Sequence, residues 1–173
     1  MNEVNKIITF ANGSSIYLSG IFPIINSTYP SNIDVIISFL DHFDQHHNFS
    51  RKNIQHYLFT INDSPNENIT QLFEPTYNII YRSICNNKNI LIHCRAGISR
   101  SVTIIIAFFL SCLKKSPSLI VSYIHRDHDN WTDSILAFIR RKRCFVNPNY
   151  GFMNQLYKYE ESLFENSRRY IYR

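Results

Sequence analysis

The hydrophobic pattern of the first third of the chain predicts strands. Short runs rich in β-branched and aromatic residues are separated by turn signals, and Asn12-Gly13 is a dipeptide typical of a tight hairpin. Asn62–Asn66, which reads Asn-Asp-Ser-Pro-Asn, predicts a loop. The expected strands are Lys6–Phe10, Ile16–Leu18, Ile33–Leu40 and His56–Ile61.

Helical periodicity dominates the remainder. Phe73–Cys85 predicts a helix that has Pro75 in its first turn and ends at Asn86–Asn89. After the short apolar strand Ile90–Ile92, Ser101–Leu113 is apolar nearly all round, which is typical of a helix in the middle of a core. Further helices are expected at Leu119–His125, at Trp131–Lys142, and around the amphipathic stripe of Phe152, Leu156, Tyr159 and Leu163.

Strands that alternate with helices and are followed by helices alone predict an α/β fold, with a central mixed, mostly parallel sheet flanked by helices. The 173 residues fit one domain, and no repeat or linker divides them, so we expect a single domain over 1–173. The longest apolar run, Val102–Leu110, is too short for a membrane span, and Met1–Phe10 lacks the apolar core of a signal peptide.

Net charge and cysteine content narrow the range of binding partners and cellular compartments that we expect. The net charge of +5 suits an anionic partner, and it equally suits simple solubility. The spacing of the four cysteines matches neither a zinc site nor a secreted disulfide scaffold. We therefore expect a reduced, intracellular protein of the cytoplasm or nucleus, or of a host cell or virion if a virus encodes it.

Residues 93–101 read His-Cys-Arg-Ala-Gly-Ile-Ser-Arg-Ser and lie between an apolar strand and a buried helix. In that context the loop amides and the helix N-terminus converge on one anion. Gly97 permits the tight curvature, and the planar fork of Arg100 binds two phosphate oxygens at once. The same positive groups favour the thiolate of Cys94, so the segment predicts a phosphate-binding loop with a nucleophile.

The segment resembles the signature loop of the protein tyrosine phosphatase superfamily, His-Cys-x5-Arg-Ser/Thr, and its wording resembles the dual-specificity branch. Ile16–Gly20 and Phe145–Leu156 resemble the family's opening strand and the run before its last helix. The resemblance covers about nine-tenths of the chain. It implies a nucleophilic Cys94, a phosphate clamp at Arg100, tuning of the sulfur by His93 and Ser101, and substrate contacts from His93, Arg95, Ala96, Gly97, Ile98, Ser99, Arg100 and Asn149.

The resemblance also implies a general acid on a loop before the nucleophile, and Asp63 fits that place better than Glu67 or Asp44. Asp63 would protonate the leaving oxygen and then activate the water that hydrolyses a cysteinyl-phosphate. Neither a cofactor nor a metal ion is required. Asn149 matches a family position, where it either braces the loop or serves a turn.

The substrate class stays open at this point. The short chain resembles small stand-alone members, some of them virus-encoded, whose shallow site admits phosphoserine, phosphothreonine and phosphotyrosine in proteins. Phosphatases of RNA 5′-ends or phosphoinositides tend to carry Lys or His where this chain has Ala96 or Ile98. An inactive phosphoprotein-binding module is another alternative. Nucleic-acid binding is the weakest one, and homodimerisation is open.

Other clusters have ordinary interpretations beside functional ones. Asp41–His47 and His125–Asp129 are better explained as surface loops than as metal sites. Arg140–Arg143 suits a second phosphate or RNA, or simply a solvated helix end. Cys85 or Cys112 is a candidate to pair with Cys94 under oxidation.

Overall fold

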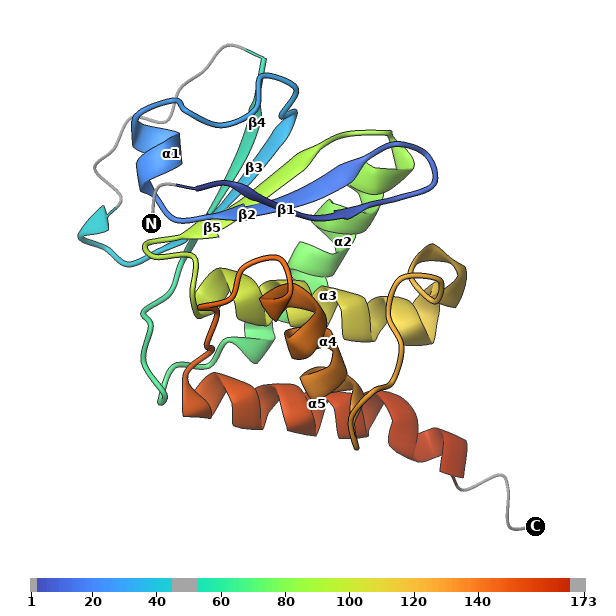
Figure 1. Ribbon diagram of the computed structural model, residues 1–173. Helices are drawn as coiled ribbons and strands as arrows, with labels where there is room; N and C mark the ends of the chain where they lie inside the picture. Colours follow the sequence, from blue (N-terminus) through green and yellow to red (C-terminus); the bar gives the residue numbers. More distant parts are fainter. Residues whose placement is uncertain (1–2, 45–52, 169–173) are drawn as a thin grey trace.

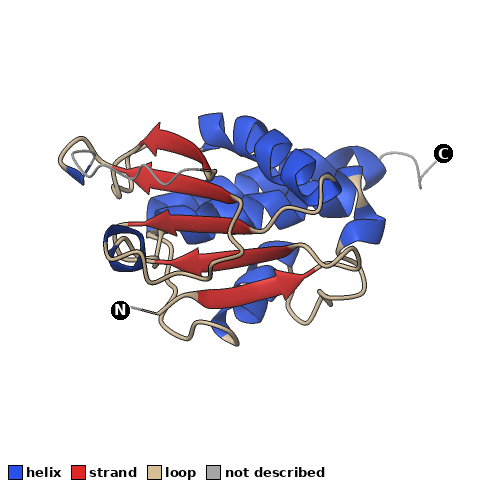
Figure 2. Ribbon diagram, turned by 90° about the horizontal axis from the view of Figure 1, so that it is seen from above, coloured by secondary structure: helices blue, strands red, loops and turns tan. Residues whose placement is uncertain are grey.

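The computed structural model describes residues 3–44 and 53–168, in which a five-stranded sheet has the order β1-β2-β5-β3-β4. Its edge strand β1 runs antiparallel to β2, while β2, β5, β3 and β4 pair in parallel, so the expected mixed, mostly parallel sheet is confirmed. Figure 2 shows this opposite direction of one edge strand. The strands are β1 (Asn5–Thr9), β2 (Ser15–Ser19), β3 (Val35–Leu40), β4 (Gln55–Thr60) and β5 (Ile90–Cys94).

The three central strands are buried along their whole length. Every residue of β2, β3 and β5 is buried, which is the burial expected of parallel strands covered on both faces. The edge strand β4 is instead partly exposed throughout, although Phe59 stacks on Phe39 of β3 with ring centroids 5.4 Å apart.

The longer helices lie together on one face of the sheet (Figures 1 and 2). At their centre α3 packs against α2, α4 and α5, and all of its residues from Arg100 to Cys112 are buried. On the other face, Ile24 of α1 packs with Tyr17 and Leu91 in a smaller apolar cluster. The helices are α1 (Phe22–Ile25), α2 (Phe73–Cys85), α3 (Arg100–Lys115), α4 (Trp131–Arg140) and α5 (Tyr150–Arg168).

The helix expected at Leu119–His125 is wrong. The chain forms a short 3-10 helix, Pro117–Leu119, and then isolated turns such as Ile124 N to Ile120 O at 3.2 Å. Ile120 and Ile124 are buried as their spacing indicated. Several β-branched residues and a stretch under two turns give too few hydrogen bonds to sustain a regular helix. The short helix α1 was not predicted, because four residues give no readable period.

The fold brings one edge of the sheet and one helix end together. Strand β5 ends at Cys94 and α3 begins at Arg100, so residues 95–99 form the connecting loop at the carboxyl ends of the parallel strands. Ligands of open α/β sheets bind at that edge. None of the helices that the structure describes is both long and apolar enough to cross a membrane.

Candidate functional site

The Cys94 sulfur lies at the bottom of the loop and accepts two hydrogen bonds. Its donors are the backbone N–H of Gly97, at 3.2 Å, and the hydroxyl of Ser101, also at 3.2 Å. Cys94 itself is 1% exposed. Since both donors present a positive hydrogen to the sulfur, they stabilise it as an anion.

Gly97 is required at its position for two reasons. Its φ of +68° lies in the left-handed region that favours glycine. In addition, a Cβ atom there would collide with the carbonyl of Ser19 and lie 2.9 Å from Nη2 of Arg143. The glycine expected from the sequence to permit a tight loop therefore also permits close packing behind it.

Arg100 presents a buried nitrogen that makes no hydrogen bond. Its Nη1 donates to the carbonyl of Ile61 at 3.0 Å, and its Nε lies 3.7 Å from Oδ2 of Asp63. Only 4% of the side chain is exposed, and Nε lacks a hydrogen-bond partner. An unsatisfied buried donor is costly, so this N–H is suited to an anionic ligand oxygen.

Asp63 is held over the loop by two donors. Its Oδ1 accepts from the Ser99 hydroxyl at 2.6 Å and from Nδ2 of Asn149 at 2.9 Å. The carboxylate remains 36% exposed, so it is accessible to a ligand as well as fixed. The structure thus brings together the predicted residues Asp63, Ser99 and Asn149 from three distant segments.

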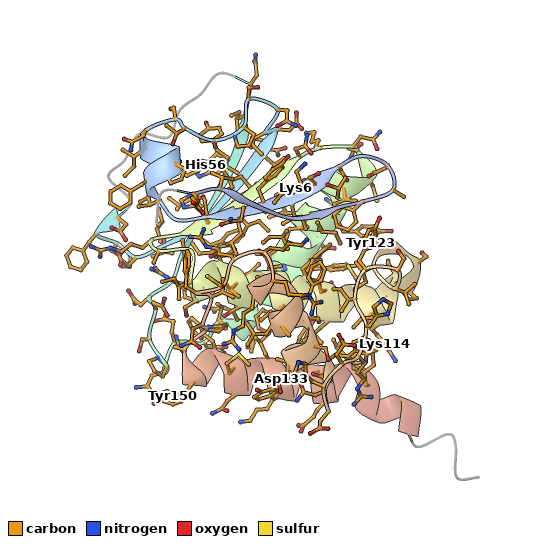
Figure 3. All side chains as sticks on the ribbon, in the orientation of Figure 1. Lys6, His56, Lys114, Tyr123, Asp133 and Tyr150 are labelled. Carbon is orange, nitrogen blue, oxygen red and sulfur yellow. The ribbon has the colours of Figure 1, made fainter. Side chains whose placement is uncertain are left out.

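Asn149 joins the loop of Asp63 to the start of α5. Its side-chain oxygen accepts from the backbone N–H of Phe152 at 2.9 Å and so caps the helix. Its own N–H donates to the Ser99 hydroxyl at 3.2 Å. A Cβ atom at Gly151 would collide with the carbonyl of Pro65, which shows how closely the loop packs on the helix. Tyr150 projects outward from the same turn (Figure 3) and is 69% exposed.

His93 lies behind the nucleophile, fully buried, in a chain of hydrogen bonds. Nδ1 is 3.3 Å from the carbonyl oxygen of Cys94, and Nε2 is 2.5 Å from the Ser38 hydroxyl. The same hydroxyl is 2.6 Å from Nε2 of His56, a β4 residue labelled in Figure 3. Burial lowers the pKa of His93 to about 3, so the ring is neutral at neutral pH.

The proton positions in this chain follow from the acceptor at its end. A carbonyl only accepts, so Nδ1 of His93 carries the proton and Nε2 accepts from Ser38. The Ser38 oxygen therefore accepts from Nε2–H of His56. His93 is fully buried and contacts the site through the backbone carbonyl of Cys94. Its direct contact with a substrate stays a prediction.

The outer part of the loop is open. Arg95 points outward, with 66% of its side chain exposed, and its Nε lies 3.9 Å from Oδ2 of Asp44. Ala96 and Ile98 are half-buried. Of the two alternative acids, Asp44 pairs with Arg95, while Glu67 accepts from Nδ2 of Asn62 at 3.1 Å.

Arg143 is the contact that the sequence did not predict. The run Arg140–Arg143 suggested a second anion site or a solvated helix end, yet Arg143 is buried and donates to the carbonyls of Ala96 and Gly97. A signal was present, because Ile135, Ile139 and Arg143 follow one another at a spacing of four and so continue one buried face.

The remaining clusters give no second centre in the residues described. Within 3–44 and 53–168, no group of three or more acidic, histidine or cysteine residues is placed to hold a metal ion. Residues 45–47 of the Asp41–His47 cluster lie outside that range. Cys85 and Cys112 are free, and burial raises the pKa of Cys112 far above its ordinary value. Their pairing with Cys94 stays a prediction.

Comparison with known proteins gives consistent similarities. Residues 22–162 match the family described as "Dual specificity phosphatase, catalytic domain". The chain is 33% identical over 122 residues to the tyrosine-protein phosphatase yvh1 of Schizosaccharomyces pombe, which covers 70% of this chain and 32% of that protein. It is 31% identical over 145 residues to 123R of Invertebrate iridescent virus 6, named as a tyrosine phosphatase, which covers 81% of this chain and 92% of the viral protein.

A solved structure agrees in fold. The human tyrosine phosphatase-like serine/threonine/tyrosine-interacting protein matches with a TM-score of 0.73 and 25% identity, over 92% of this chain and 97% of the human one. Several curated relatives are much longer than the region they share. The chain spans 20%, 32% and 51% of the length of three of them.

Proposed function

Since the chain belongs to the family of dual specificity phosphatase catalytic domains, we propose that it is a protein phosphatase. Its substrates are phosphotyrosine and phosphoserine or phosphothreonine side chains of proteins, and its intermediate is a cysteinyl-phosphate. The observation that carries the proposal is the meeting of three groups: the doubly hydrogen-bonded sulfur of Cys94, the buried Nε of Arg100, which makes no hydrogen bond, and the exposed carboxyl of Asp63.

The first step is attack of the Cys94 thiolate on the phosphorus. The sulfur–phosphorus bond forms as the phosphorus–oxygen bond to the side chain breaks, and Asp63 gives its proton to the departing oxygen. The loop amides and the Arg100 guanidinium hold the non-bridging oxygens during this transfer. The buried Nε of Arg100 then donates a hydrogen bond to one of these oxygens.

The second step hydrolyses the cysteinyl-phosphate. The carboxylate of Asp63 takes a proton from a water molecule, whose oxygen bonds to phosphorus while the sulfur–phosphorus bond breaks. The electron pair returns to Cys94, where the Ser101 hydroxyl and the Gly97 amide stabilise it. Inorganic phosphate leaves, and the protein needs neither a metal ion nor a cofactor.

Two rival functions are less well supported. An inactive phosphoprotein-binding module would not need a thiol, a guanidinium and a carboxyl together, and this chain retains Cys94, Arg100 and Asp63. A phosphatase for RNA 5′-ends or phosphoinositides would be favoured by Lys or His in the loop, where this chain has Ala96 and Ile98. No nucleic acid is part of the proposed mechanism.

The chemistry of the proposed nucleophile indicates the cellular compartment in which the protein acts. A thiolate at Cys94 stays active only in reducing surroundings, which supports an intracellular site of action in the cytoplasm or nucleus, or in a host cell or virion. The partner that the reaction requires is a phosphoprotein. A homodimer is compatible with the mechanism, and the mechanism does not depend on one.

Hydrolysis of p-nitrophenyl phosphate in the presence of EDTA tests the proposal. Wild type should be active, Cys94→Ser should be inactive, and Asp63→Asn should lose about 10²–10⁴-fold in kcat, the usual contribution of a general acid. Phosphotyrosine and phosphothreonine peptides, assayed beside a 5′-triphosphorylated RNA and a phosphoinositide, then define the substrate class. Folded wild type that hydrolyses none of these would reject the enzyme and favour the binding module.

A further inference from the structure

Arg143 is a buried cation whose hydrogen bonds all go to neutral acceptors. Only 2% of the residue is exposed, and none of the ion pairs within 4.0 Å found in the described residues includes it. Burying a charge without an ionic partner is costly, so the position demands a compensating role. Its acceptors are Gly97 O at 3.0 Å from Nε, Ala96 O at 3.2 Å from Nη2, and Glu3 O at 3.1 Å and Asn5 Oδ1 at 2.6 Å from Nη1.

The peptide group between Ala96 and Gly97 is held at both of its ends. Its carbonyl oxygen accepts from Nη2 of Arg143 at 3.2 Å, and its N–H donates to the sulfur of Cys94 at 3.2 Å. The C=O and N–H of a trans peptide point in opposite directions, and this chain has no cis peptide in the described residues. A donor that holds the carbonyl from behind therefore directs the N–H at the sulfur.

The other two nitrogens of the Arg143 guanidinium are also hydrogen-bonded, and these bonds fix its orientation. Nε holds the next carbonyl, that of Gly97, while Nη1 reaches Asn5 at the start of β1. The centroid of the Phe145 ring lies 4.4 Å from the guanidinium carbon, so the ring packs over the cation. The planar fork thus links the first strand of the sheet to two consecutive peptides of the loop, which a lysine would not do.

Charge acts in the same sense as geometry. Burial lowers the pKa of Arg143, and the negative charge of Cys94 is the first of the influences that raise it. A cation and an anion that stabilise each other do so reciprocally. The buried guanidinium therefore lies close enough to Cys94 to interact with a negative charge on its sulfur.

We propose that Arg143 is a positioning residue for the nucleophile, directing the Ala96–Gly97 amide at Cys94 and stabilising its thiolate. The consequence for turnover rests on the phosphatase function proposed above. The consequence for Cys94 does not, because the reactivity of a thiolate toward an alkylating agent needs no substrate.

The test is the rate of Cys94 alkylation by iodoacetamide between pH 4 and 8, followed by mass spectrometry of the peptide that contains Cys94. Arg143→Met should react about tenfold more slowly than wild type at low pH, because the amide directed at the sulfur and the nearby cation are both lost. Arg143→Lys should be intermediate, since it keeps the charge and loses the fork. The exposed neighbour Arg141, changed to Gln, is the matched control and should behave as wild type.

Each outcome decides the proposal. A folded Arg143→Met protein with the wild-type alkylation curve overturns it. If Arg143→Met does not fold, Asn5→Ala decides instead, because it keeps the cation and removes its shortest anchor. A smaller loss of alkylation rate in Asn5→Ala supports the proposal, and an unchanged rate rejects it. If the substitutions slow alkylation of Cys94 but the wild-type protein hydrolyses no phosphate ester, the proposed function alone is rejected.

Discussion

At the scale of single residues, two serines of one segment serve different partners. The Ser101 hydroxyl donates to the sulfur of Cys94, and the Ser99 hydroxyl donates to Asp63. Replacing Ser101 by Ala removes a donor that stabilises the sulfur when the cysteinyl-phosphate is hydrolysed. We expect kcat for p-nitrophenyl phosphate to fall about tenfold, the effect of about 1.4 kcal/mol, with the second step becoming rate-limiting.

Stopped-flow kinetics checks the Ser101 prediction. Ser101→Ala should release a burst of p-nitrophenol close to one equivalent of enzyme, whereas Ser101→Thr, which keeps a hydroxyl, should retain most of the activity. Wild-type kcat without a burst in Ser101→Ala would mean that the Gly97 amide alone suffices to stabilise the leaving sulfur.

Asn149 makes a second residue-scale prediction, because one side chain caps α5 and holds Asp63. Asn149→Ala should lower the free energy of unfolding by about 1 kcal/mol through loss of the cap. It should also reduce kcat, since the carboxyl loses one of its two donors. Asn149→Asp is the informative comparison, since it keeps the cap and places a second carboxylate beside Asp63. Urea unfolding should show a loss of stability in both variants, through the missing cap in Asn149→Ala and through repulsion between the two carboxylates in Asn149→Asp. Steady-state kinetics should show a loss of kcat in both.

At the scale of elements, the sequence predicted what lies within one segment and missed what depends on packing between segments. The strand, loop and helix around Cys94 follow from local pattern, and Gly97 follows from the curvature that they require. Arg143 reaches the loop from the segment after α4, and Ser38 of β3 reaches His93 of β5. The spacing of Ile135, Ile139 and Arg143 indicates that Arg143 is buried, but the residues next to Arg143 and Ser38 in the sequence do not indicate their partners. Asp63 is intermediate between these cases. The sequence predicts its loop, but its hydrogen bond with Asn149 depends on how α5 packs against that loop.

The bond between β3 and β5 through Ser38 and His93 carries an element-scale prediction. Ser38→Ala removes the hydroxyl that donates to the buried Nε2 of His93 and accepts from Nε2–H of His56. We expect a loss of about 1–3 kcal/mol in the free energy of unfolding. The matched control is Ser83→Ala in α2, where the hydroxyl donates to a carbonyl within its own helix, at Ile79. Equal losses from the two substitutions in urea titrations would argue that the chain behind Cys94 adds no stability.

At the scale of the whole molecule, the stability of the fold behind the site depends on a buried histidine that must stay uncharged. His93 must stay neutral for Nε2 to accept from Ser38, and it does so because burial lowers its pKa from 6.5 to about 3. The unfolded chain binds a proton at that residue below pH 6.5, while the folded protein does not until near pH 3. Stability from this residue is therefore complete above pH 6.5 and declines as the pH falls, by about 1.4 kcal/mol per pH unit.

The fold is therefore less stable in acid than at neutral pH. A salt-bridged carboxylate also loses its stabilising effect in acid, but over a lower pH range. Burial also lowers the pKa of His56, so both imidazoles of the chain destabilise the folded protein in the same direction as the pH drops. Urea unfolding at pH 7.5, 6.0 and 5.0 should show a steep fall for wild type and a shallower one for His93→Gln, which removes the titrating group while keeping a polar side chain. Parallel pH dependences in the two proteins would show that His93 contributes nothing to acid sensitivity, and the neutral ring behind the nucleophile would lose its energetic role.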